Sequence, residues 1–299
     1  MNIDYEEQLP LWTASIEKDY GLILSNDIDS LASCCLLQKE TNWKIKAVML
    51  HYFNKYKIER LKADEEPLDY FGVLERGLKF SGLIGVDLAL MDGKSFDNHL
   101  QIYENNIYPN PKSVNINNFC LVNRENYKKK YAASTFLMLW SLFDYPDTGI
   151  SDDLKMLLLS IDVGFKGFFK KTFREHLEHY MIDILELPNL YDFLAYHDKK
   201  EFYDFHEKLN LGRKIYIDKN DYLDSNINIS EIQRIFDDNS IEIDLQLPTE
   251  QFHRSFYCRS MESTTFPTEK NIFTLSLVEK NKFKYSVVFS EKEKGAKTA

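Results

Sequence analysis

The feature that most constrains the fold of this chain is a set of acidic residues at the ends of apolar segments. In the stretch GLILSNDIDSLASCCLL, residues 21–37, Asp27 and Asp29 follow a short apolar run and precede apolar and small residues. A buried, unpaired carboxylate is costly, and two neighbouring carboxylates repel each other. A fold that buries this stretch must therefore compensate the charge of both acids.

Three further segments repeat this pattern. Asp87 lies in IGVDLAL, Asp97 and His99 lie in FDNH, and Asp162 lies in LLLSIDVGF. A single Asp at the end of a strand most often caps a helix or a turn. Four such segments in one chain instead favour a shared site, because a cation can compensate several carboxylates at once. Oxygen-rich sites of this kind suit Mn²⁺ or Mg²⁺.

The order of the predicted elements indicates an α/β fold with a parallel sheet. Strands are predicted at 21–24, 43–50 and 82–90, and helices at 30–39 and 131–143. Strands that alternate with helices are typical of parallel sheets. Because the loops at the carboxyl ends of such strands meet in one crevice, we expect the acidic segments to converge there.

The chain changes character near residue 216. Residues 216–230 are polar and predict a loop, and a short helix is predicted at 230–237. The β-rich segments that follow, the last with a hairpin around Lys280-Asn281-Lys282, are SIEIDLQL (240–247), SFYCRS (255–260) and IFTLSLVEKNKFKYSVVFS (272–290). We therefore expect an α/β catalytic domain at 1–215. A smaller, β-rich α+β domain at 216–299 would serve as a substrate-binding lid.

Composition narrows the classes of partner and compartment. The formal net charge of -10 argues against duplex nucleic acid, which proteins bind mainly by neutralising phosphates. The four cysteines form neither a disulfide framework nor a zinc motif, which favours a reducing cytoplasm. No apolar stretch approaches the roughly 20 residues of a membrane helix, so we expect no membrane partner. The oligomeric state is left open.

The order of the acidic segments resembles that of the DHH phosphoesterase superfamily. NDIDSLAS resembles the first motif of that superfamily, GVDLAL the second, and FDNH the Asp-His-His motif that names it. AASTFLMLWSLF resembles the Ser-Thr helix that follows, and LLLSIDVGFKGF resembles the fourth motif. The resemblance covers about residues 20–170.

This resemblance implies manganese-dependent hydrolysis of a phosphoester or phosphoanhydride by two metal ions. Asp27 would bind one ion, Asp29 the other, Asp87 would bridge them, and Asp162 would complete the second site. His99 would face the substrate phosphate and polarise it or protonate the leaving group. Asp97 would orient the FDNH segment or support a ligand. The implied substrates are a short single-stranded oligonucleotide, a cyclic dinucleotide or a nucleotide.

The sequence departs from the superfamily pattern at the metal ligands. Asn98 stands where the motif has its first histidine, and an amide oxygen is the weaker ligand. Residues 23–26 lack the metal-binding histidine that many members carry, so one ion is an alternative to two. A degenerate module that binds a nucleotide or a partner without turnover is therefore the second hypothesis. A third is an unrelated Mg²⁺-dependent phosphatase that uses Asp27 as a covalent nucleophile.

Two arginines in the C-terminal segment are candidates for substrate binding. Arg254 and Arg259 lie in FHRSFYCRSMES, and a guanidinium offers a bidentate fork to phosphate oxygens. The alternative is that both are ordinary exposed residues of a strand.

Overall fold

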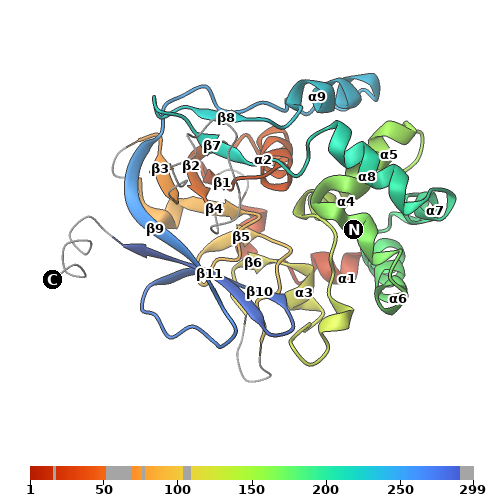
Figure 1. The fold of residues 1–299 in the computed structure, drawn as a ribbon, viewed down its shortest axis with the longest axis horizontal. Helices are drawn as coiled ribbons and strands as arrows, with labels where there is room; N and C mark the ends of the chain where they lie inside the picture. Colours follow the sequence, from red (N-terminus) through yellow and green to blue (C-terminus); the bar gives the residue numbers. More distant parts are fainter. Residues whose placement is uncertain (16–17, 52–68, 76–77, 104–108, 290–299) are drawn as a thin grey trace.

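One nine-stranded sheet organises the molecule, in the order β10-β11-β9-β3-β2-β1-β4-β5-β6, and a separate pair, β7-β8, lies beside it (Figure 1). The computed structural model describes residues 1–15, 18–51, 69–75, 78–103 and 109–289. The strands are β1 (Gly21–Leu24), β2 (Lys44–Leu50), β3 (Tyr70–Val73), β4 (Leu83–Val86), β5 (Lys94–Phe96), β6 (Ser113–Val114), β7 (Ile215–Ile217), β8 (Leu223–Ser225), β9 (His253–Ser263), β10 (Ile272–Glu279) and β11 (Lys282–Phe289).

The half of the sheet formed by β2, β1, β4, β5 and β6 is parallel throughout. Parallel strands are buried on both faces, which explains why β1 and β4 read as continuous apolar runs rather than as alternating ones. The predicted α/β class is therefore confirmed in its coarse form. Because these strands point the same way, their carboxyl ends lie at one edge.

The other half of the sheet is antiparallel and uses the C-terminal segment. β3 pairs with β2 on one side and with β9 on the other, and the β10–β11 hairpin extends the sheet beyond β9. The sheet then curls, because Leu275 N–H donates to Ala89 O at 2.9 Å and Leu277 N–H donates to Leu100 O at 2.8 Å. The hairpin at the sheet's edge thus reaches the loops that follow β4 and β5. One sheet runs across the boundary predicted at residue 216, and the division into two domains stays a prediction.

The helices form a layer beside the parallel half of the sheet, with α4 to α8 gathered at one end of the molecule (Figure 1). Among the described residues, none of them is both long and apolar enough to cross a membrane. Their bounds are α1 (Ile3–Glu6), α2 (Ile28–Thr41), α3 (Ile116–Phe119), α4 (Thr135–Leu142), α5 (Asp152–Ser160), α6 (Lys171–His179), α7 (Pro188–Tyr196), α8 (Lys199–Lys208) and α9 (Ile229–Asp238).

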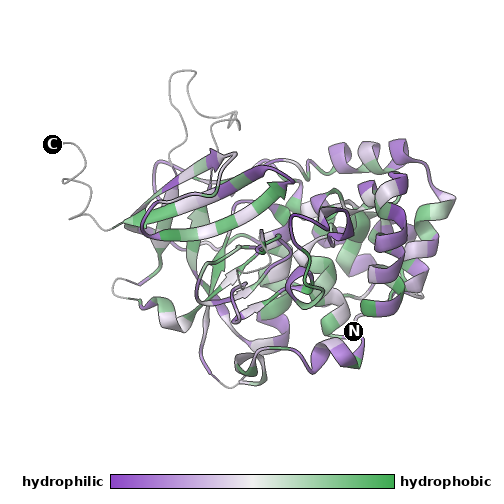
Figure 2. Ribbon diagram, turned by 90° about the horizontal axis from the view of Figure 1, so that it is seen from below, coloured by the Kyte–Doolittle hydropathy of each residue, from purple (hydrophilic) through white to green (hydrophobic). Residues whose placement is uncertain are grey.

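Each face of the sheet has its own apolar core. Leu22 and Leu24 of β1 face the main core, which they share with the helices. Ile23 points the other way, into a second core inside the curl that includes Phe71 and the half-buried Phe256 of β9. Figure 2 shows the matching pattern on the helices, which carry hydrophilic residues on their outer surfaces. The C-terminal strands therefore cover the face of the sheet that the helices leave open.

Two predictions about the C-terminal segment are wrong. Residues 241–249 form no strand; several of their apolar side chains, such as Ile243, point into the main core from an irregular chain. Residues 216–230 are not a plain loop, because Ile215–Ile217 and Leu223–Ser225 pair as the β7–β8 hairpin. The predicted hairpin at 280–282 is confirmed by the pairing of β10 with β11.

Candidate active site

A polar residue follows every strand of the parallel half of the sheet. Asp27 lies three residues beyond β1, His51 follows β2, Asp87 follows β4, Asp97 follows β5 and Asn115 follows β6. The carboxyl ends of parallel strands meet at one edge, so the topology gathers these side chains. The expected convergence of acidic segments thus has a structural basis.

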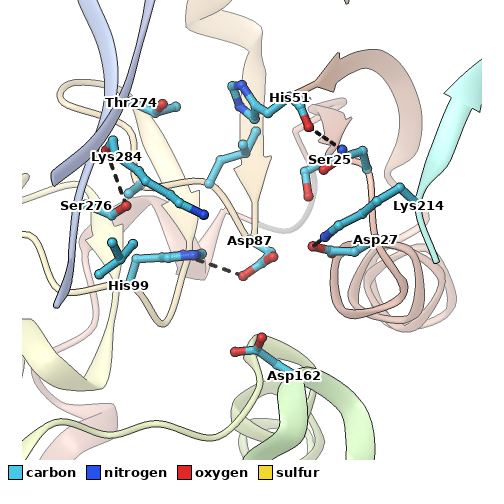
Figure 3. Close-up of a pocket in the computed structure, with 14 residues that line it drawn as sticks. Ser25, Asp27, His51, Asp87, His99, Asp162, Lys214, Thr274, Ser276 and Lys284 are labelled. Carbon is cyan, nitrogen blue, oxygen red and sulfur yellow. Dashed lines mark hydrogen bonds and ion pairs between the residues drawn. The ribbon is translucent and has the colours of Figure 1, made fainter. Parts of the chain in front are cut away.

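A cavity of about 220 Å³ lies at this edge. Figure 3 shows Asp87 in its middle, between His99 on one side and Asp27 on the other, with Asp162 beyond. The lining residues come from the segments after the parallel strands, from the segment after α5, from the residue before β7 and from the hairpin: Ser25, Asn26, Asp27, His51, Asp87, Leu88, Ala89, His99, Asp162, Lys214, Thr274, Ser276, Val278 and Lys284.

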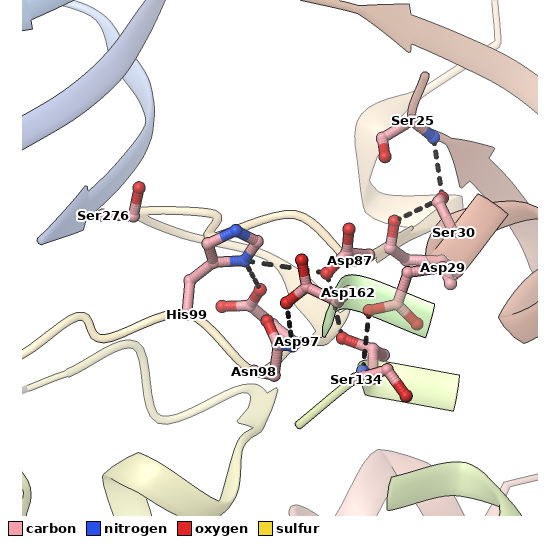
Figure 4. Close-up of polar contacts among 12 residues, drawn as sticks. Ser25, Asp29, Ser30, Asp87, Asp97, Asn98, His99, Ser134, Asp162 and Ser276 are labelled. Atoms are coloured by element: carbon pink, nitrogen blue, oxygen red, sulfur yellow. Dashed lines mark hydrogen bonds and ion pairs between the residues drawn. The ribbon is translucent and has the colours of Figure 1, made fainter. Parts of the chain in front are cut away.

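Asp87, Asp97 and His99 form a compact group that could hold a metal ion, since their ligand atoms lie within 4.8 Å of one another. His99 Nδ1 lies 2.7 Å from Asp97 Oδ1 and 3.7 Å from Asp87 Oδ1. Figure 4 shows Asp97 beside the His99 ring. Asp97 is fully buried, and its second oxygen accepts a hydrogen bond of 3.1 Å from Asn115 Nδ2. Asp97 therefore fixes the orientation of the His99 ring.

The charges in this group shift each other's pKa. Burial lowers the pKa of His99, but Asp97 and Asp87 outweigh burial and raise it to about 9. Burial, reinforced by the charge of Asp27, raises the pKa of Asp87 to about 8. Burial lowers the pKa of His51 to about 4. At neutral pH the cavity therefore has one cationic and one neutral histidine on its walls.

Asp27 combines a capping role with a place in the cavity. Its side chain accepts the N–H of Ser30 at 3.2 Å, which caps α2. The second oxygen accepts a hydrogen bond of 3.0 Å from Lys214 Nζ. Burial opposes ionisation of Asp27, but Lys214 and the Ser30 N–H prevail and lower its pKa. Asp27 is therefore an ionised carboxylate at the cavity, as a metal ligand needs to be.

Asp29 points away from the cavity, to the start of α4. Its two oxygens accept the N–H groups of Thr135 at 2.8 Å and of Phe136 at 2.7 Å. A carboxyl group at a helix N-terminus satisfies orphan N–H donors. Burial, reinforced by the charge of Asp87, raises the pKa of Asp29 well above its ordinary value. Asp29 is not among the residues that line the cavity. Its assignment to a metal ion stays a prediction, and the structure gives it a second role.

Asp162 and Asn98 meet beneath Asp87. Asp162 is the second residue of a 3-10 segment (Ile161–Gly167), and it adopts a left-handed conformation with φ 50°. Asn98 Nδ2 donates to Ala133 O at 2.7 Å and lies 3.4 Å from Asp162 Oδ2. The amide group of Asn98 therefore ties the segment after β5 to the entrance of α4, and its role as a metal ligand stays a prediction.

The two predicted arginines lie outside the cavity. Arg254 is exposed and stacks on the Tyr70 ring, with its guanidinium carbon 4.6 Å from the ring centroid. Arg259 is also exposed and occupies the face of β9 opposite Ser260. Their role in substrate binding stays a prediction, since neither lines the cavity.

Sequence analysis missed three basic residues of the cavity. His51 directly follows the strand predicted at 43–50, so its position after a buried strand was a usable signal. Lys214 precedes β7, and Lys284 lies on β11 with its side chain reaching toward His99 (Figure 3). Neither lysine carries a local signal. The curled sheet brings Lys284 to the strand ends, and a hydrogen bond from Ile215 N–H to Asn26 O at 2.8 Å brings Lys214 there.

The donor set fits a hard divalent cation. Carboxylate oxygens with at most one imidazole are the ligands that Mn²⁺ and Mg²⁺ prefer, whereas a zinc site would show more nitrogen or sulfur donors. Comparisons of this chain with protein-family models, with curated proteins and with solved structures found no match. The resemblance to the DHH superfamily therefore stays a prediction that rests on the sequence motifs.

Proposed function

We propose that this protein hydrolyses a phosphoester or phosphoanhydride bond of a small substrate with Mn²⁺ or Mg²⁺. The observation that carries the proposal is the gathering of Asp27, Asp87, Asp162 and His99 around one cavity that also receives two lysines. Acids at one end and cations on the walls are the groups that phosphoryl transfer uses. The cavity's small size agrees with a nucleotide or a short oligonucleotide end, and not with a duplex.

We assign the cation to the carboxylates around Asp87, with Asp27 on the side away from His99 and Asp162 beyond. His99 of the Asp87, Asp97 and His99 group is left for the proton, because its Nδ1 is hydrogen-bonded to Asp97. A cation bound there would polarise a phosphoryl oxygen and supply a nucleophile from water at neutral pH. Asp27 is held ready for this role, because Lys214 keeps it ionised. Such an ion would also compensate the negative charge of two or more buried carboxylates.

The proton and the phosphate are handled by the basic side chains. His99 donates Nδ1–H to Asp97, which leaves its Nε2–H for the oxygen of the leaving group. In hydrolysis the oxygen of water bonds to phosphorus, the bond to the leaving oxygen breaks, and that oxygen takes the His99 proton. Lys284 and Lys214 line the cavity and bind the phosphate oxygens. The attacking water releases one proton to solvent, and solvent returns a proton to His99.

The second candidate is a binding module that does not turn over its ligand. Two observations favour it: both oxygens of Asp29 accept backbone N–H groups, and the amide of Asn98 contacts a backbone carbonyl. Both residues match metal-ligand positions of the superfamily. A chain that holds only one ion would still bind a nucleotide, with slower or no hydrolysis.

The deciding experiment is hydrolysis of a substrate panel with added Mn²⁺. The panel contains bis-p-nitrophenyl phosphate, pyrophosphate, cyclic di-AMP and di- to pentanucleotides. Asp87→Asn, which removes the central carboxylate, is expected to lower turnover by about 100-fold or more. Asp221→Asn is the matched control, because Asp221 is an exposed aspartate that also has a positive φ, 63°.

The outcomes separate the two candidates. Turnover that is lost in Asp87→Asn and kept in Asp221→Asn supports the hydrolase. No turnover of any substrate, together with a rise in melting temperature on adding Mn²⁺ and nucleotide, supports the binding module. No turnover and no rise in melting temperature would exclude both.

A further inference from the structure

The inner face of the β10–β11 hairpin changes from apolar to polar where it reaches the cavity. Side chains alternate along a strand, and Tyr285 and Val287 of β11 face an apolar cluster outside the curl. On the other face, Val288 packs in the core inside the curl. The next two residues on that face, Ser286 and Lys284, are polar, and Lys284 lines the cavity.

The neighbouring strand β10 shows the same change. Thr274 and Ser276 line the cavity and are only 7% and 8% exposed. Thr274 Oγ1 lies 2.6 Å from Ser286 Oγ, and Ser276 Oγ donates to Lys284 O at 3.4 Å. A sheet face this deeply buried is normally apolar, since burying hydroxyl groups costs free energy. We call Thr274 and Ser276, which line the cavity, the hydroxyl wall.

The strand ends face the hydroxyl wall with polar groups of their own. Ser25 follows β1 and is 4% exposed. His51 lies 2.8 Å from Ser260 Oγ through its Nδ1, and this contact holds the ring beside the cavity. In Figure 3, Thr274 and His51 lie on the far side of Asp87 from Asp162. The cavity therefore has an acidic end and an end with hydroxyl groups and an imidazole.

We propose that the cavity binds a small phosphorylated sugar or polyol, with its phosphate at the acidic end and its hydroxyl groups against the hydroxyl wall. This narrows the substrate class of the proposed function and rests on it. Serine and threonine hydroxyls both donate and accept, so they match the hydroxyl groups of a sugar. Size agrees, because 220 Å³ lies below the roughly 300 Å³ at which pockets for larger ligands begin.

A nucleobase would meet a different surface. Proteins hold bases by stacking them on aromatic rings. Among the described residues that line the cavity, the rings are those of His51 and His99, and the rest are acidic, basic, hydroxyl-bearing, amide or aliphatic. We therefore expect the sugar phosphate, rather than a base, to supply most of the binding free energy.

Calorimetric titration with Mn²⁺ tests the proposal, in a His99→Gln background that slows turnover during the measurement. Ribose 5-phosphate is expected to bind about tenfold more tightly than phenyl phosphate. The double variant Thr274→Val with Ser276→Ala is expected to bind ribose 5-phosphate about tenfold more weakly and phenyl phosphate unchanged. Ser25→Ala probes the opposite wall with a smaller change, and His253→Ala, an exposed residue of β9, is the control.

Two results would overturn the proposal: equal affinity for the two ligands, or equal losses for both in the double variant. Hydrolysis is measured separately, with the protein that retains His99. Selective binding of ribose 5-phosphate without hydrolysis of any substrate would reject the proposed function and keep the ligand class. Hydrolysis of phenyl phosphate and ribose 5-phosphate at equal kcat/KM would support the proposed function and reject the ligand class.

Discussion

At the scale of single residues, the surroundings of Asp87 at the candidate site are unfavourable for a carboxylate. It is 8% exposed, has φ 55°, and shares its surroundings with other acids. A non-glycine residue in the left-handed region is uncommon and tends to occur where function requires it. Thr135 Oγ1 donates to Asp87 at 3.0 Å and the His99 cation lies 3.7 Å away, but burial and the charge of Asp27 outweigh both contacts.

Asp87→Asn is therefore expected to stabilise the metal-free protein while abolishing turnover. The amide keeps an acceptor for Thr135 and removes a carboxylate whose pKa is raised to about 8. At pH 8.5 the free energy of unfolding should rise by about 1 kcal/mol or more, because one pKa unit corresponds to about 1.4 kcal/mol. Urea unfolding with EDTA measures it. Equal stability of the variant and the unaltered protein would contradict the assignment of an unfavourable charge.

Lys214 competes with a metal ion for Asp27. Its Nζ lies 3.0 Å from Asp27 Oδ2, so a cation at Asp27 has to share the carboxylate with an ammonium group. Lys214→Met should raise the affinity for Mn²⁺ several-fold and lower kcat/KM, because one competing cation and one phosphate contact are both lost. Lys46→Met is the control, since Lys46 pairs with Asp19 away from the cavity. A variant that changes both quantities in the same direction would reject this dual role.

At the scale of elements, the acidic segment after β1 joins helices that lie far apart in the chain. Asp29 is in the first turn of α2, and it accepts N–H groups at the start of α4, 106 residues away. Ser134 Oγ caps the same helix by accepting the N–H of Leu137 at 2.9 Å. The position of α4, and with it Thr135 beneath Asp87, therefore depends on Asp29.

Asp29→Ala should destabilise the protein by about 2–4 kcal/mol, because it leaves two buried N–H groups without an acceptor. Asp29→Asn should cost less, since one oxygen stays available. Asp198→Ala removes an exposed capping residue of α8 and should cost only about 1 kcal/mol. Thermal and urea unfolding measure all three variants. The role of Asp29 as a helix anchor fails if Asp29→Ala costs no more than Asp198→Ala.

The sequence predicted β1, β2 and β4 of the parallel half, although the strand expected at 82–90 ends at Val86, and it predicted neither β5 nor β6. The C-terminal elements were predicted unevenly. The strands 21–24 and 43–50 have strong apolar runs, which local periodicity can detect. Apolar and polar residues alternate along 241–249 as they do in a strand. The apolar side chains pack into the main core, but the segment pairs with no other strand. No local pattern reports that β9 pairs with β3, because that pairing depends on residues about 180 positions apart.

The candidate site was predictable to the extent that strand ends were predictable. Asp27, Asp87, Asp162 and His99 all line the cavity, because each belongs to a segment that leaves a buried element. The spacing Asp-x-Asp could not reveal that Asp29 points to α4. That direction depends on where a distant helix begins, which the local sequence does not encode.

At the scale of the whole molecule, the buried charges predict how stability depends on pH. The pKa of His99 in the folded protein, about 9, exceeds its ordinary value. Protonated His99 therefore stabilises the fold fully below pH 6.5, and this stabilisation is lost gradually between pH 6.5 and pH 9. Asp87 stays protonated in the folded protein up to about pH 8, whereas in the unfolded chain it has already lost this proton at lower pH. Both groups therefore lower stability as pH rises. His51, with its pKa lowered to about 4, contributes a gain that is complete by pH 6.5.

The metal-free protein should therefore unfold more easily at pH 8.5 than at pH 6.5, by roughly 1–3 kcal/mol. Added Mn²⁺ should reverse the trend, because the ligands bind a cation only when deprotonated. Urea titrations at both pH values, with EDTA and with Mn²⁺, measure the four conditions. A metal-free protein that gains stability over this interval would contradict the assigned directions.

The pairing of β9 with β3 also has a consequence for the order in which the molecule forms. Contacts between residues near 72 and residues near 254 close a very long loop, and such contacts slow folding. A ribosome releases β1, β2 and β4 long before β10 and β11, so the acids are in place before the hydroxyl wall exists. The nascent chain therefore has an open acidic edge, and the walls of the cavity are complete only when the last hairpin docks.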